Sequence, residues 1–159
     1  MNWDLITDII LYTSFAVLGV FAFLGLYQWI KRKSLKKVDR ELLAVFPPLI
    51  LMSATYFIFD KIFILNTRPD GSGKPSFPSS HVMTATTIFA IIALMLPKYI
   101  KSKPLRIILD LIMATLLVLL PIGRVATGKH WTSDVIAGLI FAAIFIVIYY
   151  LIIRRKHHA

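Results

Sequence analysis

The sequence predicts an all-α fold, a polytopic membrane helix bundle with about five transmembrane helices. Of its 159 residues 58% are hydrophobic, whereas soluble domains contain roughly 45 to 50%. Only 16% are charged, and these residues gather in short runs between continuous apolar stretches. The stretches lack the alternating pattern of membrane β-barrel strands. The length leaves no room for a second domain, so we expect one domain over residues 1–159.

Five apolar runs approach the roughly 20 residues that a membrane-spanning helix needs. The third and fourth are short, but flanking residues 79–81 and 105–106 extend them. Pro47 and Pro48 remove helix hydrogen bonds from the second run, so they should kink that helix or delay its start. The first run follows acidic rather than basic residues and shows no cleavage site, so we expect it to be retained as an anchor. The runs are residues 9–30, 42–59, 82–97, 107–122 and 135–153.

The basic residues predict the orientation of the bundle. Of the 18 Lys and Arg residues, 13 lie in the connections 31–41 and 98–106 and in the tail 154–156. The positive-inside rule assigns these segments to the cytoplasm, which places the N-terminus outside and the C-terminus inside. We therefore expect a multi-pass protein of the plasma membrane. Beside apolar spans, the net charge of +10 indicates contact with lipid headgroups, not with nucleic acid.

Two segments on the predicted outer face, residues 60–81 and 123–134, concentrate the remaining cations. Several Lys and Arg side chains at the mouth of a helix bundle are suited to bind an anion. Phosphate is the anion that best combines the point charge of Lys with the bidentate hydrogen bonds of Arg. Phosphoryl transfer is the chemistry that this cluster favours. The segments hold Lys61, Arg68, Lys74, Arg124 and Lys129, together with both histidines that lie outside the tail.

The composition points away from a metal or other cofactor. Cysteine is absent, which excludes disulfides, thiolate catalysis and Cys-ligated metal. The outer segments offer no carboxylate cluster for Mg²⁺ and no zinc set beyond two histidines and one aspartate, and the nearby cations would repel a dication. We expect no metal requirement.

Two histidines stand out within these segments. His130 and Asp134 are four residues apart, so on a helix they share one face, and the carboxylate can accept a hydrogen bond from one ring nitrogen. The other nitrogen is then free to attack. An isolated pair with this spacing is more often a structural hydrogen bond or half of a metal site. His81 follows Ser79 and Ser80, good helix caps at a point where backbone N–H groups would face an anion.

Lys61 and Arg68 are seven residues apart, which is two turns if the second helix continues past its apolar run until Pro69 ends it. With Arg124 they should bind nonbridging phosphate oxygens and stabilise the transition state. The alternative is that Lys61 pairs with Asp60 and Arg68 binds lipid headgroups.

These residues resemble the three-part signature of the type 2 phosphatidic acid phosphatase superfamily, K-x6-R-P, then P-S-G-H, then S-R-x5-H-x3-D. The resemblance covers residues 61–134, about half of the chain. Ser80 stands where the family usually has Gly, and Gly123 where it usually has Ser. The corresponding residues are Lys61, Arg68 and Pro69; Pro78, Ser79, Ser80 and His81; and Gly123, Arg124, His130 and Asp134.

The resemblance implies a metal-independent lipid phosphatase whose catalytic core covers about residues 60–153. His130 would be the nucleophile that forms a phosphohistidine, with Asp134 fixing its tautomer. His81 would protonate the leaving oxygen and then activate water. The phosphate would lie among the three cations and the residues Ser79 and Ser80. Family members commonly have six spans, so five imply a shortened N-terminal part.

Two other functions remain open on the sequence. A membrane protein that binds or transports anions would use the same basic mouth without covalent chemistry. A lipid phosphotransferase would pass the phosphoryl group to an acceptor other than water. The substrate also stays open among undecaprenyl diphosphate, phosphatidic acid, phosphatidylglycerol phosphate and a lipid A phosphate, because the motifs contact only the phosphoryl group.

Overall fold

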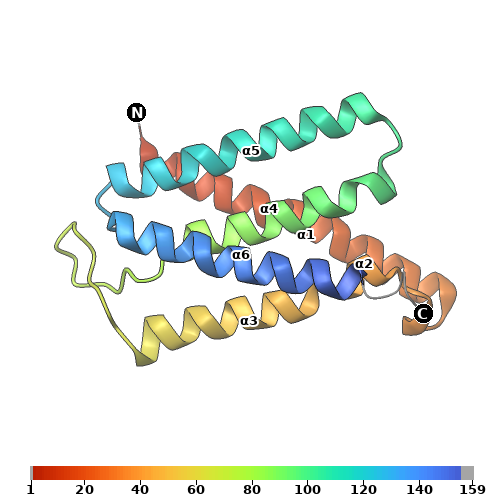
Figure 1. Ribbon diagram of the computed structural model, residues 1–159, viewed down its shortest axis with the longest axis horizontal. Helices are drawn as coiled ribbons and strands as arrows, with labels where there is room; N and C mark the ends of the chain where they lie inside the picture. Colours follow the sequence, from red (N-terminus) through yellow and green to blue (C-terminus); the bar gives the residue numbers. More distant parts are fainter. Residues whose placement is uncertain (1, 155–159) are drawn as a thin grey trace.

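The predicted membrane bundle is confirmed by the computed structural model of the protein, which describes residues 2–154. Within this range five helical stretches are long and apolar enough to cross a membrane, and they lie side by side along the long axis of the molecule (Figure 1). The elements are α1 Trp3–Arg32, η1 Leu35–Lys37, α2 Arg40–Leu43, α3 Phe46–Phe57, η2 Ile58–Ile62, α4 Ser80–Tyr99, α5 Lys103–Ala126 and α6 Thr132–Arg154.

The second span is interrupted near its start, as the two prolines predict. Helix α2 ends at Leu43, and α3 begins at Phe46 with Pro47 and Pro48 in its first turn. Proline is tolerated there because the N–H groups of the first turn have no intrahelical acceptor. The span then closes with one turn of π-helix, η2. The helical part of this span therefore ends six residues before Arg68.

Helix α4 forms the centre of the bundle and packs against α1, α3, α5 and α6. In its most apolar stretch 61% of the residues are buried, against 11% in α1 and in α5. The outer helices expose large apolar side chains such as Phe23 and Leu111, as expected where lipid tails cover the protein. A helix that packs against four others provides a rigid base for residues at its N-terminus.

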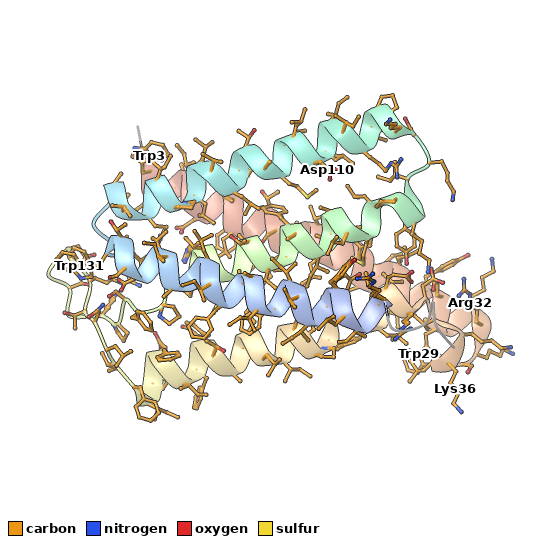
Figure 2. The ribbon with its side chains drawn as sticks, in the orientation of Figure 1. Trp3, Trp29, Arg32, Lys36, Asp110 and Trp131 are labelled. Carbon is orange, nitrogen blue, oxygen red and sulfur yellow. The ribbon has the colours of Figure 1, made fainter. Side chains whose placement is uncertain are left out.

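The two ends of the bundle differ in character. Helix α1 begins at the same end as the connection between η2 and α4, whereas the described chain finishes at the opposite end (Figure 1). Figure 2 shows Trp3 and Trp131 at the first end and Trp29, Arg32 and Lys36 at the second. Tryptophan at both ends is typical of the two membrane–water interfaces. The two segments predicted to form the site share the first end.

The end of the bundle that carries Arg32 and Lys36, here called the basic end, is held together by a polar network around Asp39. Its carboxylate accepts hydrogen bonds from Gln28 (2.9 Å), Arg32 (3.2 Å) and Tyr99 (3.0 Å). Burial alone would raise the pKa of Asp39, but these bonds and the nearby Lys98 outweigh it and lower the pKa. The network joins α1, the residue before α2 and the end of α4, so it fixes the helices far from the candidate site.

Candidate active site

The connection between η2 and α4 folds into a small hairpin over the end of the bundle. Thr67 pairs with Pro75 in an antiparallel bridge, and the Arg68 N–H donates to the Lys74 carbonyl (3.0 Å). The turn contains Gly71 and Gly73 at φ values of 74° and 67°, a conformation that glycine adopts at little cost. The hairpin turns the Arg68 guanidinium back toward the bundle.

His130 lies between α5 and α6, with only 3% of its surface exposed. Its Nδ1 lies 2.7 Å from the carbonyl oxygen of Ser76, and its Nε2 lies 3.4 Å from Nη2 of Arg124. A carbonyl oxygen only accepts, so Nδ1 carries the proton and Nε2 presents a lone pair. Burial, and then the positive charge of Arg124, lower the pKa of His130 to about 4. The imidazole is neutral at physiological pH and suited to nucleophilic attack.

Asp134 does not accept the hydrogen bond expected from His130. Its carboxylate lies 4.0 Å from the imidazole Nδ1 and accepts instead from the Trp131 N–H and the Asn66 side chain, both at 3.0 Å. The Asp134 carbonyl also accepts from the Ser79 N–H at 3.0 Å. The fully buried Asp134 therefore lies in the first turn of α6 and ties this helix to both outer segments. The Ser76 carbonyl orients the histidine in its place.

His81 lies in the first turn of α4, and its Nε2 is 3.0 Å from the Asp8 carboxylate of α1. Ser79 immediately precedes the helix and is buried. Helix α6 approaches closely here, since a Cβ at Gly138 would lie only 2.9 Å from the Ser79 carbonyl. The backbone N–H groups of the first turn of α4 have no intrahelical acceptor, so this end of the helix is a favourable place for an anion.

A cavity opens between these elements. It is lined by Arg68, Ser80 and His130, together with Tyr56 and Asp60. Arg124 is 4% exposed and connects the two histidine environments, because Nη2 faces His130 and Nη1 lies 3.9 Å from the Asp8 carboxylate. A second, apolar groove adjoins the cavity through Tyr56 and Ser80, and His81 lines this groove. The arrangement places a neutral imidazole and a guanidinium around one small cavity.

Of the three candidate cations, Arg68 lines this cavity and Arg124 contacts His130, whereas Lys61 does neither. The helix ends at Ile62 instead of continuing to Arg68, so the expected two-turn spacing is wrong. The Lys61 ammonium pairs with Asp60 at 2.8 Å and is 63% exposed. This is the alternative contact considered above for Lys61. Because Asp60 lines the cavity, Lys61 neutralises a carboxylate that would otherwise repel an anion.

Four residues of the site could not be identified from the sequence motifs. Ser76 contributes through its backbone carbonyl, which has no side-chain signature. Asn66 is an isolated amide two residues before Arg68. Thr7 and Asp8 come from α1, more than 50 residues before the first motif. The sequence does carry a signal for them, because Asp4 and Asp8 are acidic residues at the end of the bundle where Arg68 and Arg124 also lie.

Comparison with known proteins agrees with the motifs. The sequence profile of the PAP2 superfamily matches residues 57–158. A curated relative, the lipid A 1-phosphatase of Rhizobium johnstonii, is 35% identical over 84 residues, covering 53% of this chain but 30% of that protein. The chain thus spans less than a third of that relative. A transmembrane PAP2-type phosphatidylglycerolphosphate phosphatase from Bacillus subtilis has a similar fold, with a TM-score of 0.62 and 22% identity over 98% of this chain and 76% of that one.

Proposed function

Because the chain belongs to the PAP2 superfamily, we propose that it is an integral membrane phosphatase that removes phosphate from lipid monoesters or diphosphates. The observation that carries the proposal is the setting of His130. A buried, neutral imidazole is held by Ser76 on one side, while its unprotonated Nε2 lies beside Arg124 and the ring lines the cavity. A mere anion-binding protein has no need for an oriented nucleophile.

The positions of these groups support the following reaction. Nε2 of His130 attacks phosphorus, while Arg68, Arg124 and the N–H groups at the start of α4 bind the nonbridging oxygens. His81 donates a proton to the leaving oxygen as its bond to phosphorus breaks. Water, deprotonated by His81, then attacks the phosphohistidine and releases inorganic phosphate, which restores both histidines. The cations supply the charge that a metal ion provides in other phosphoryl-transfer sites.

A lipid is the substrate class that fits the surroundings. The groove beside the cavity lies between α1, α3 and α4 and is lined by apolar residues that include Leu11, Phe15 and Met52. It shares Tyr56 and Ser80 with the cavity. An apolar tail in this groove would keep its phosphate at the mouth. The basic residues of the connections 31–41 and 98–106, at the other end of the spans, support an active site on the outer face of a plasma membrane.

Phosphate release from purified protein in detergent tests the function. We expect release from a panel of lipid mono- and diphosphates in the presence of EDTA, because no step above requires a metal ion. His130→Ala should lower the rate by at least a thousandfold, since it removes the nucleophile. Lys74→Ala is the matched control, because it removes an exposed cation of the outer hairpin that does not line the cavity. Dependence on added metal, or substantial activity in His130→Ala, would contradict the proposal.

Trapping and product analysis separate the two alternatives. A phosphatase of this type yields an acid-labile phosphohistidine that is absent from His130→Ala, whereas a carrier yields none. A phosphotransferase also forms this intermediate, but its phosphoryl group appears on an added acceptor lipid instead of in solution. Release of free phosphate without an acceptor therefore supports hydrolysis.

A further inference from the structure

Helix α1 lies outside the family signature, yet it packs directly on signature residues. A Cβ at Gly123 would lie 2.5 Å from Thr7 Cγ2 and 2.9 Å from the Trp3 ring. Real Cβ atoms do not approach other atoms so closely, so only glycine at position 123 allows α1 and α5 to meet in this way. Gly123, which replaces the serine of the family signature, therefore allows α1 to pack closely on α5 in this chain.

This close approach brings α1 side chains to the charged groups of the site. The Thr7 hydroxyl is buried and lies 3.4 Å from Nη1 of Arg124. The Asp8 carboxylate lies 3.0 Å from His81 Nε2 and 3.9 Å from the same Arg124 nitrogen. Asp8 is therefore a partner of both the histidine and the buried arginine.

The contact defines what each nitrogen of His81 can do. A carboxylate accepts, so Nε2 carries a proton directed at Asp8. The other nitrogen, Nδ1, is buried and has no hydrogen-bond partner among the described residues. Nδ1 is consequently the nitrogen left for proton exchange with a substrate. The hydrogen bond from Nε2 to Asp8 holds the ring in the orientation that keeps Nδ1 without a partner in the described part of the chain.

Charge supports the same role for Asp8. The charged groups that face His81 are Arg124 of α5, Arg68 of the outer hairpin and Asp8 of α1. The two arginines oppose a positive charge on the ring, and a general acid must carry that charge before it donates its proton. Asp8 provides the opposing negative charge in direct contact.

We propose that Asp8 is a positioning residue that holds His81 ready to protonate the leaving oxygen, so that α1 completes the active site. The inference rests on the proposed phosphatase function. In the step concerned, the bond between His130 Nε2 and phosphorus forms as the bond between phosphorus and the leaving oxygen breaks. The His81 Nδ1 proton moves to that oxygen, and His81 becomes neutral while its other proton stays on Nε2, hydrogen-bonded to Asp8.

The dependence of the rate on the leaving group tests this role. A long-chain alkyl phosphate needs a general acid because its alkoxide is a poor leaving group, whereas 4-nitrophenyl phosphate releases a stable phenolate. Asp8→Asn should lower kcat for the alkyl ester about ten- to a hundredfold, with KM changed less than threefold, and lower kcat for the aryl ester less than threefold. Asp8→Glu should recover part of the loss. In the His81→Ala background, Asp8→Asn should add little further loss, because both act on one step.

Asp4→Asn is the matched control, because Asp4 is a carboxylate one turn earlier on α1, 3.9 Å from Lys129. Asp8→Asn that behaves like Asp4→Asn overturns the proposal. Equal losses on both esters also overturn it, since they would indicate a role in folding or phosphate binding. If the phosphatase function itself is wrong, His130→Ala retains activity and no phosphohistidine forms, whereas failure of the Asp8 role alone leaves those two results intact.

Discussion

At the scale of single residues, chemistry in this site depends on neighbours that the chain brings from a distance. His130 is neutral because it is buried beside Arg124, and it is oriented because the Ser76 carbonyl accepts from Nδ1. Asp134, four residues away, instead anchors the start of α6. On an exposed helix with the same i,i+4 aspartate, the histidine would keep a pKa near its ordinary value. Tertiary contacts, and not the spacing to Asp134, therefore give His130 the neutral and oriented imidazole that the proposed mechanism needs.

The pKa of His130 is directly measurable. NMR titration of histidine-labelled protein should show His130 titrating near pH 4, below its ordinary value of 6.5. The chain has four histidines, and the signal lost in His130→Ala identifies the resonance. A transition close to pH 6.5 would show that the ring is not held in the buried, cationic setting described here.

The sign of this shift also predicts a dependence of stability on pH. Since the folded protein binds the proton less readily than the unfolded chain, His130 costs no stability above pH 6.5. It lowers the free energy of unfolding as the pH falls from 6.5 toward 4, because only the unfolded chain gains the proton.

At the scale of elements, the contact between α1 and α5 decides whether the N-terminal helix reaches the site. Gly123 permits a separation that no larger residue allows, and Thr7 fills the space. Helix α4 in turn is held on the other side by α6 at Gly138. Two glycines without any polar role thus set the positions of Asp8 and Ser79.

Restoring the serine of the family signature should therefore harm this protein. Gly123→Ser places a Cβ against Thr7 and Trp3, so we expect the free energy of unfolding to fall by about 1 to 3 kcal/mol, the usual cost of overpacking. Phosphate release should fall with it. Thr7→Ala in the same chain should recover part of both losses, because it removes the atom in closest contact. Thermal unfolding in detergent and the phosphate assay measure the two effects.

Gly19→Ser is the control for this pair, since a Cβ there meets nothing within 4 Å. Its unfolding midpoint should differ little from that of the parent protein. A Gly123→Ser variant as stable and active as Gly19→Ser would mean that α1 does not pack on α5 as described.

At the scale of the whole molecule, charge and chemistry are separated between two ends. The outer hairpin, the start of α4 and the segment around His130 share one end, and the long basic connections occupy the other (Figures 1 and 2). We expect the positively charged residues to have a different role at each end. Arg68 and Arg124 face the candidate site, whereas we expect the clustered Lys and Arg residues of the other end to orient the chain in the membrane.

The absence of cysteine makes the orientation simple to test. Ser72→Cys introduces a thiol on the exposed tip of the outer hairpin, and Ser102→Cys places one in the exposed connection before α5. In intact spheroplasts a membrane-impermeant maleimide should label only the first variant, because we expect the site to face outward. Both should react after permeabilisation. Labelling of Ser102→Cys alone in intact spheroplasts would show that the active site faces the cytoplasm.

The sequence by itself determined the five spans, the interruption near Pro47 and Pro48, the family signature and the two segments that form one end. These features follow from local properties, since span length depends on runs of apolar residues and proline acts on its own turn. Helices that alternate in direction bring every second connection to the same side. The grouping of Arg68, Arg124 and His130 was therefore predictable without any knowledge of their contacts.

Only the tertiary structure decided which partner each of these residues has. The end of the helix at Ile62 separates Lys61 from Arg68, and a backbone carbonyl at Ser76 replaces the expected Asp134 as the acceptor for His130. Asp8 reaches His81 from a helix 73 residues away in the chain. Backbone acceptors and contacts between helices depend on how closely the helices approach, and that distance is set by the packing of small residues across interfaces, which a single sequence does not display.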